Sequence, residues 1–319
     1  MIQNRTPGLK FWPAALLAAG LTACTTLPDQ GMPRMAAPPP RPASPAPAPA
    51  DTEKSAAIRA YYTQIQASLL AQGRLRTDGG GQDTPFDARI LAENFIRIAL
   101  YDEYSRQDGA FKAGESSSIL RRWDVPIRFQ IHFGASVPAD RRAADRARIA
   151  SYLKRLSDLT RHPITLVDQG GNFSLYVVSE DEREALGPAL RSALPGLSTQ
   201  DVTDVTGMQP TTYCLVYALS DGDSGNYRRA VAVVRAEHPD LLRQSCYHEE
   251  IAQGLGLAND SPRARPSIFN DDEEFALLTR QDELMLKILY DPEMWPGMTE
   301  AEAAPVVRRI AQRLMGGGT

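Results

Sequence analysis

Apolar residues recur along the chain at two spacings, which predict where helices and strands lie. Helical spacing covers residues 56–72 and 87–104, with Leu91 and Phe95 on the buried face of the second segment. Strict alternation of apolar and polar residues over 126–133 predicts a half-buried strand. The chain therefore begins its periodic part with helices and then enters a sheet.

The rest of the pattern continues this mixture. It predicts a helix at 139–160, strands at 164–167 and 173–178, a helix at 182–193, strands at 212–218 and 230–236, and a helix at 239–256. This order describes an α+β fold with helices on one face of a twisted mixed sheet. We expect residues 56–122 to form a helical preface packed on the main domain, and residues 123–319 to form that domain with its C-terminal helices.

The first 55 residues follow a different pattern. Arg5 and Lys10 precede an apolar run at residues 11–21, and Leu-Thr-Ala-Cys24 follows, which is the order of a cleaved secretory signal. The run is about half the length that a helix needs to span a bilayer. We expect residues 1–23 to be a signal peptide and Cys24, which ends a lipobox-like sequence, to carry lipid.

Residues 24–55 are expected to be the lipidated Cys and a Pro/Ala-rich disordered linker, because 25–50 hold nine prolines and almost no large apolar residue. Thr25 follows Cys24, so the aspartate that retains lipoproteins in the inner membrane is absent. The predicted location is the cell envelope, lipid-anchored and facing the periplasm, with the outer membrane favoured over the inner. The membrane would be a partner through the lipid anchor.

Charge and cysteine content narrow the picture further. The formal net charge is −4 and the sequence has no cluster of Lys and Arg, which argues against nucleic acid as a partner. Of the three cysteines, Cys24 would take the lipid, leaving Cys214 and Cys246 as a candidate disulfide in an oxidising compartment. Two buried free thiols are the alternative.

The most informative segment is the last predicted helix before residue 260. His248-Glu249 does not begin an H-E-x-x-H site, because Ala252 stands where the second histidine would be. Shifted by one residue, the positions of H-E-x-x-H-x-x-G-x-x-H hold Glu249, Glu250, Gln253, Gly256 and Asn259. The glutamate that acts as general base and the glycine remain, while all three histidines are replaced.

This spacing resembles that of the metzincin zinc proteases, over about residues 126–292. Ser267-Ile-Phe-Asn-Asp271 stands where those proteases have their Met-turn, with Phe269 in place of Met. The resemblance implies a metzincin-like twisted mixed sheet, a long helix and an active-site-type helix.

The chain more closely resembles a family of proteobacterial putative lipoproteins known only as a domain of unknown function. The run that resembles the signature of this family consists of Glu249, Glu250, Gln253, Gly256, Asn259, Asp260, Ser267, Phe269, Asn270 and Asp271. This second resemblance implies no activity.

The donor types at these positions decide the expected chemistry. Glu249 and Gln253 share the i, i+4 face of a helix, and Asn259 would return after Gly256. One carboxylate and two amide oxygens form a poor zinc site but suit a hard cation such as calcium. We expect no zinc and no other cofactor, with a hard divalent cation as the alternative.

Three functional hypotheses follow. In the first, the domain is an inactive or altered protease relative whose polar cleft binds an unknown peptide or envelope protein. In the second, it is a hydrolase or peptidase in which Glu250 is the general base, paired with Asp271 or Glu249 and using an unusual metal or none. In the third, the helix is merely amphipathic and the function lies elsewhere.

Overall fold

A mixed sheet of six strands organises the part of the chain that the computed structural model describes, residues 50–319 without 108–109, 271 and 317–319. Its strands are β3 (Arg122–Trp123), β4 (Ile127–Phe133), β5 (Ile164–Val167), β6 (Phe173–Val178), β7 (Cys214–Ser220) and β8 (Asn226–Arg235). Strands β5, β4, β6 and β8 lie in this order and are parallel, and β3 pairs in parallel with the first residues of β8. Strand β7 pairs antiparallel with β8 and forms one edge.

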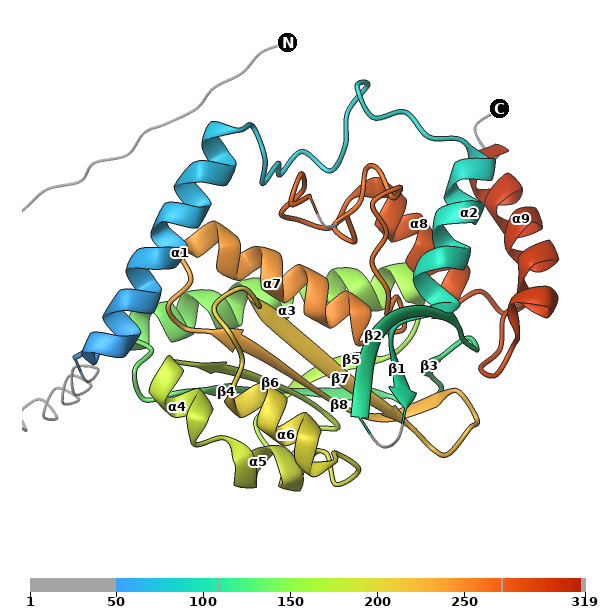
Figure 1. Ribbon diagram of the computed structural model, residues 1–319. Helices are drawn as coiled ribbons and strands as arrows, with labels where there is room; N and C mark the ends of the chain where they lie inside the picture. The colour runs from blue at the N-terminus through green and yellow to red at the C-terminus, as the bar shows by residue number, and fades with distance from the viewer. Residues whose placement is uncertain (1–49, 108–109, 271, 317–319) are drawn as a thin grey trace, which may run out of the picture. The chain divides into compact units, whose positions relative to one another are not determined.

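Helices cover both faces of this sheet (Figure 1). They are α1 (Glu53–Ala71), α2 (Ala88–Ala99), α3 (Ala139–Thr160), α4 (Glu180–Glu184), α5 (Gly187–Ala193), α6 (Thr199–Thr206), α7 (Asp240–Gln253), α8 (Arg280–Leu289) and α9 (Glu300–Gly316). The larger core joins one sheet face to α2, α3, α7, α8 and α9, and a smaller core joins the other face to α5 and α6. The fold is α+β as expected, but the expectation that helices cover only one face is wrong. Strand β6 and residues 230–234 of β8 are buried and almost entirely apolar on both faces, as expected for strands packed on both sides.

Two predicted helices end differently in the structure. Helix α2 stops at Ala99 and the chain enters β1 (Tyr101–Gln107), which pairs antiparallel with β2 (Ala110–Ser117) in a separate hairpin. Strand pairing with a later segment overrides the helical spacing there, so the prediction of a helix to residue 104 is wrong. The predicted helix at 182–193 is two helices, because Pro188 lacks the N–H that would continue the first one.

A disulfide joins Cys214, at the start of the edge strand β7, to Cys246 in the middle of α7, with a Cα–Cα separation of 5.9 Å. The predicted pairing is confirmed. The bond fixes the edge of the sheet to the helix that contains Glu249, Glu250 and Gln253.

Buried ion pairs hold the same region together. Asp145 of α3 is fully buried and accepts hydrogen bonds from Arg243 Nε (2.8 Å) and Tyr247 Oη (3.0 Å) of α7. Arg235, at the end of β8, forms a buried ion pair with Glu180 and donates to the carbonyl oxygens of Met208 and Gln209. These contacts set the positions of α7 and of the loop that leads into β7.

Candidate functional site

Helix α7 and the turn after it bring the predicted site residues toward the interior of the domain. The helix ends at Gln253, and Gly256 has a φ of +126°, a conformation that L side chains rarely adopt. A Cβ at residue 256 would lie 2.2 Å from the carbonyl oxygen of Arg121. The sequence therefore needs glycine here, and the turn redirects the chain so that residues 257–260 run back past the end of the helix.

Side chains from distant elements satisfy the carbonyl groups that the end of α7 leaves unpaired. Trp123 Nε1 donates to the carbonyl oxygen of Gly254 (2.8 Å), and Tyr290 Oη donates to that of Leu255 (3.0 Å). The geometry at the end of the helix is thus fixed by β3 and by the residue that caps α8.

Gln253 contacts Asp260 across this turn. Its Nε2 donates to Oδ1 (3.3 Å) and Oδ2 (3.5 Å) of Asp260, and both side chains are half-buried. Glu249 lies one helical turn earlier on the same face and is also half-buried. Glu249 and Asp260 also have other interaction partners in the protein. Glu249, Gln253 and Asp260 are therefore three half-buried polar side chains at the end of α7, of which Gln253 and Asp260 are hydrogen-bonded to each other.

Glu250, the candidate general base, is 3 % exposed. It also has an interaction partner within the protein. In this structure its carboxylate is therefore enclosed by the protein and does not face solvent.

Asn259 anchors the turn to α2. Its Nδ2 donates to the carbonyl oxygen of Arg97 (2.9 Å), and its backbone N–H donates to that of Ile98 (3.0 Å). Asn259 is 3 % exposed. Asn259 therefore ties the segment after Gly256 to the end of a neighbouring helix.

The segment from Ser267 to Asn270 is hydrogen-bonded to the buried carboxylate of Asp282, a residue that the sequence pattern did not identify as part of the site. Asp282 is fully buried and accepts hydrogen bonds from Ser267 Oγ (2.6 Å) and from the backbone N–H groups of Ile268 (3.1 Å) and Thr279 (2.8 Å). Burial raises the pKa of Asp282 to about 6. The signal for this role was the capping box Thr279-x-x-Asp282 at the start of α8.

The other residues of that segment have structural contacts. Phe269 is fully buried in the larger core, and Asn270 Nδ2 donates to the carbonyl oxygen of Ala264 (2.9 Å). Asp271 lies outside the described residues, as does Cys24. Within the described chain, the predicted set thus divides into the cluster at the end of α7 and the turn held by Asp282.

His248 faces away from the Glu249 and Gln253 side of α7. Its Nδ1 accepts a hydrogen bond from the backbone N–H of Leu278 (3.0 Å), and its ring stacks on Tyr152 with centroids 3.9 Å apart. Burial lowers the pKa of His248 to about 3, so the imidazole is neutral and fastens the segment before α8 to α7.

The described residues contain no group of three or more His, Cys, Asp or Glu side chains arranged to hold a metal ion. Among the helices that the structure describes, none combines the length and apolarity needed to cross a bilayer. A hollow between α3 and α8, lined by Ser151, Lys154, Arg155 and Lys287 among others, contains none of the predicted site residues.

The protein is thus an α+β domain in which a disulfide joins the edge strand β7 to helix α7. Helix α7 is followed by a glycine turn and by the polar side chains described above. The chain belongs to a family of proteins of unknown function, DUF2927, whose model matches residues 88–309. This confirms the expected membership of a family known only as a domain of unknown function. No curated protein and no solved structure matches the chain.

Proposed function

We propose that this protein is a lipid-anchored protein of the cell envelope, in which a metzincin-like domain without its zinc ligands binds an extended segment of an envelope protein. The basic residues, apolar run and Cys24 at the N-terminus support the export and the anchor. The cluster at the end of α7, with the edge strand β7, supports the binding role.

The arrangement of elements is consistent with kinship to the metzincins. A strand, a long helix and further strands lead to an antiparallel edge strand, one more strand and a helix that ends at a glycine turn. Glu249 and Gln253 lie one turn apart on that helix, as metal ligands would. The kinship would explain why the spacing is kept although the ligand types have changed.

One observation carries the proposal that the domain no longer uses zinc. The amides at two former ligand positions are engaged within the protein, Gln253 with Asp260 and Asn259 with the carbonyl oxygen of Arg97. Amide groups bind zinc weakly, whereas they are good partners for carboxylate and carbonyl oxygens. These residues are suited to holding the turn after α7 rather than a metal.

The edge strand suggests what the domain binds. Among the strands that the structure describes, β7 pairs with β8 alone and forms an edge of the sheet. Its start is fixed to α7 by the disulfide. Because an extended peptide can add a strand to such an edge, we infer an extended polypeptide as the ligand.

Metal analysis and a peptidase assay on the full chain in detergent test the loss of zinc chemistry. We expect less than one zinc ion per chain in the purified protein. We also expect that the wild type cleaves unstructured casein no faster than the Glu250→Gln variant does. One zinc per chain with cleavage that depends on Glu250 would instead establish the hydrolase hypothesis.

A peptide array tests the binding role. We expect extended peptides to bind the full chain, and N-methylation of alternate backbone amides in a bound peptide to abolish binding, because methylation removes main-chain donors. If methylation of the odd-numbered amides and methylation of the even-numbered amides both leave binding unchanged, the peptide does not bind by strand addition.

Labelling of cells with radioactive palmitate tests the anchor. The wild-type chain should incorporate the label and fractionate with membranes, whereas Cys24→Ser should do neither. Label in the Cys24→Ser variant would show that Cys24 is not the lipidated residue.

A further inference from the structure

Helix α1 lies outside the region that the family model matches, yet it contacts the start of both elements that form the proposed binding region. The family region begins at residue 88, whereas α1 spans Glu53–Ala71. Ser55 and Tyr62 of α1 are buried, and Ile58, Tyr61, Ile65 and Leu69 pack partly buried against a small core that contains Leu242 of α7. Beside this packing, α1 makes specific polar contacts, and these indicate its role.

The first contact supplies a cap to α7. The N-cap residue of α7 is Pro239, whose side chain has no hydrogen-bond acceptor. Gln66 of α1 accepts a hydrogen bond at its Oε1 from the backbone N–H of Leu242 (2.9 Å). Gln66, which lies outside the family region, therefore caps one of the unpaired backbone N–H groups in the first turn of α7.

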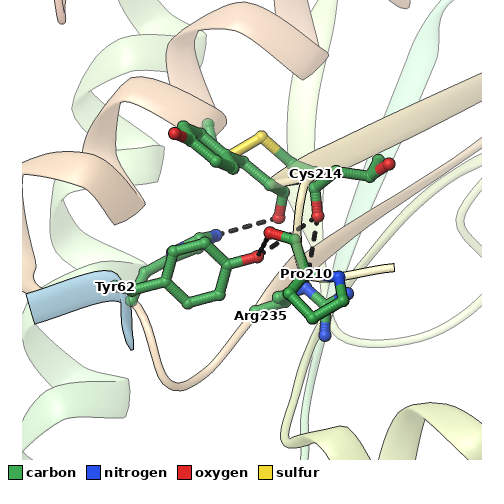
Figure 2. Close-up of a disulfide and its surroundings, with 8 residues drawn as sticks. Tyr62, Pro210, Cys214 and Arg235 are labelled. Atoms are coloured by element: carbon green, nitrogen blue, oxygen red, sulfur yellow. Dashed lines mark hydrogen bonds between the residues drawn. A yellow bond between two sulfur atoms is a disulfide. The ribbon is translucent and has the colours of Figure 1, made fainter. Parts of the chain in front are cut away.

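The second contact fixes the approach to β7. Tyr62 Oη lies 2.8 Å from the carbonyl oxygen of Pro210 and 3.3 Å from that of Thr212, just before the strand begins (Figure 2). The Tyr62 ring also packs edge-on against Tyr213 and against His238, which precedes α7. One side chain thus touches both the segment entering β7 and the segment entering α7.

The first turn of α1 adds a third contact at the carboxyl ends of β6 and β8. Ser55 Oγ donates to Oε1 of Glu237 (2.6 Å), which lies between β8 and α7, and both residues are buried. Thr52 Oγ1 donates to Asp181 Oδ2 (2.6 Å) in α4, the helix that follows β6. Helix α1 is thereby fixed at its start and along its length.

We propose that α1 is a clasp that sets the position of β7 relative to α7, and so controls whether the edge of β7 can accept a peptide. The role in peptide acceptance rests on the function proposed above, whereas the mechanical role does not. Because α1 directly follows the Pro-rich segment 25–50 in the sequence, a pull on that segment acts on α1 first. The clasp would then couple the N-terminal tether to the binding region.

Hydrogen exchange on the full chain tests the mechanical role, with Gln66→Ala as the test variant and Gln64→Ala as its control. Gln64 is exposed on the same helix, so both variants change helix propensity equally. For Gln66→Ala we expect exchange to become about fivefold faster at residues 240–244, because the first turn of α7 loses its cap. Gln64→Ala should leave these amides unchanged.

A second pair of variants tests the contact with β7. Tyr62→Phe removes the hydroxyl that reaches Pro210 and Thr212 but keeps the ring, and Tyr61→Phe makes the same change on the neighbouring residue. We expect faster exchange at residues 211–216 in Tyr62→Phe alone. Strands β4 and β5, at the far side of the sheet, should be unaffected in all four variants.

Two results would overturn the clasp. One is unchanged exchange at the starts of both β7 and α7 in Gln66→Ala and Tyr62→Phe. The other is a uniform increase that includes β4 and β5, which would mean that α1 only adds global stability. Faster local exchange in a protein that binds no array peptide would contradict the proposed function and leave the mechanical role of the clasp standing.

Discussion

The first half of α7 and its last turn are built from different kinds of polar contact. In the first half, Arg243 and Tyr247 meet the fully buried Asp145, and Cys246 is covalently bound to β7. In the last turn, Glu249 and Gln253 are half-buried, and the bonds from Gln253 to Asp260 are 3.3 and 3.5 Å long. One helix thus combines a rigid support with a looser polar end.

This difference has a physical reason. A buried charge is tolerated only when it is fully paired, so the first half of the helix cannot change without a large loss of stability. Half-exposed groups with long hydrogen bonds can exchange partners at low cost, which is a property that a binding region needs. We therefore expect substitutions along α7 to divide by position into large and small effects on stability.

The largest effect is expected for Asp145→Ala, because it removes the fully buried carboxylate that pairs with Arg243 and leaves this buried cation only the exposed carboxylate of Asp240. We expect the free energy of unfolding in urea to fall by about 3–5 kcal/mol. Asp158→Ala, in the same helix, is the matched control. Asp158 is exposed and pairs with Lys154, so its loss should cost at most about 0.5 kcal/mol. If both variants lost the same free energy of unfolding, the buried ion pair of Asp145 would stabilise the fold no more than the exposed pair of Asp158.

The next effect is expected for removal of the disulfide. The bridged cysteines are 32 residues apart, and cross-linking a loop of this length stabilises the folded state by about 3–4 kcal/mol in the chain-entropy description. The double variant Cys214→Ala/Cys246→Ala should unfold at correspondingly lower urea. Treatment with dithiothreitol should destabilise the wild type and leave the double variant unchanged. A wild type whose stability does not change on reduction would show that the disulfide does not stabilise the fold.

A smaller effect is expected from pH at His248. Its pKa is lowered from 6.5 to about 3 in the folded state, so the unfolded state binds the proton first as pH falls. The stabilisation is therefore complete above pH 6.5 and is lost progressively toward pH 3. Between pH 6.5 and 5.5, His248 should contribute a loss of about 1 kcal/mol.

The variant His248→Gln isolates this contribution, since an amide oxygen can still accept from the backbone N–H of Leu278. Urea denaturation at both pH values should give a shallower dependence than in the wild type. Asp282 works in the opposite direction below its pKa of about 6, but it is common to both proteins and cancels in the difference. An identical pH dependence in the two proteins would show that His248 has the same pKa in the folded and unfolded states, and would contradict the lowered pKa.

The smallest effect is expected for Gln253→Ala. Because Gln253 is half-buried and its bonds to Asp260 are long, its loss should cost less than about 1 kcal/mol in urea denaturation. The same variant should alter binding of array peptides if the polar end of α7 contacts the ligand. A loss above about 2 kcal/mol would place Gln253 among the supports of the fold and remove the contrast within α7.

Local sequence patterns were sufficient for most individual elements. The helix at 139–160 has the predicted bounds, and strands β5 and β6 match the predicted segments. These segments have strong apolar periodicity bounded by turn residues, so their local preference and their tertiary environment agree. Helix α6 was missed although Ser198 and Asp201 form a capping box, because it is only eight residues long and has few apolar positions.

The sequence by itself determined that the site helix is followed by a turn at Gly256, that Glu249 and Gln253 share one face, and that Cys214 and Cys246 could pair. Only the tertiary structure decided that Asn259 bonds to the carbonyl oxygen of Arg97, that Asp282 holds the Ser267 turn, and that α1 caps α7. Helical spacing and turn chemistry act within a few residues, so they can be read from neighbours in the chain. The partners of Asn259, Asp282 and Gln66 depend on which distant segments fold against them, and spacing along the sequence does not encode that choice.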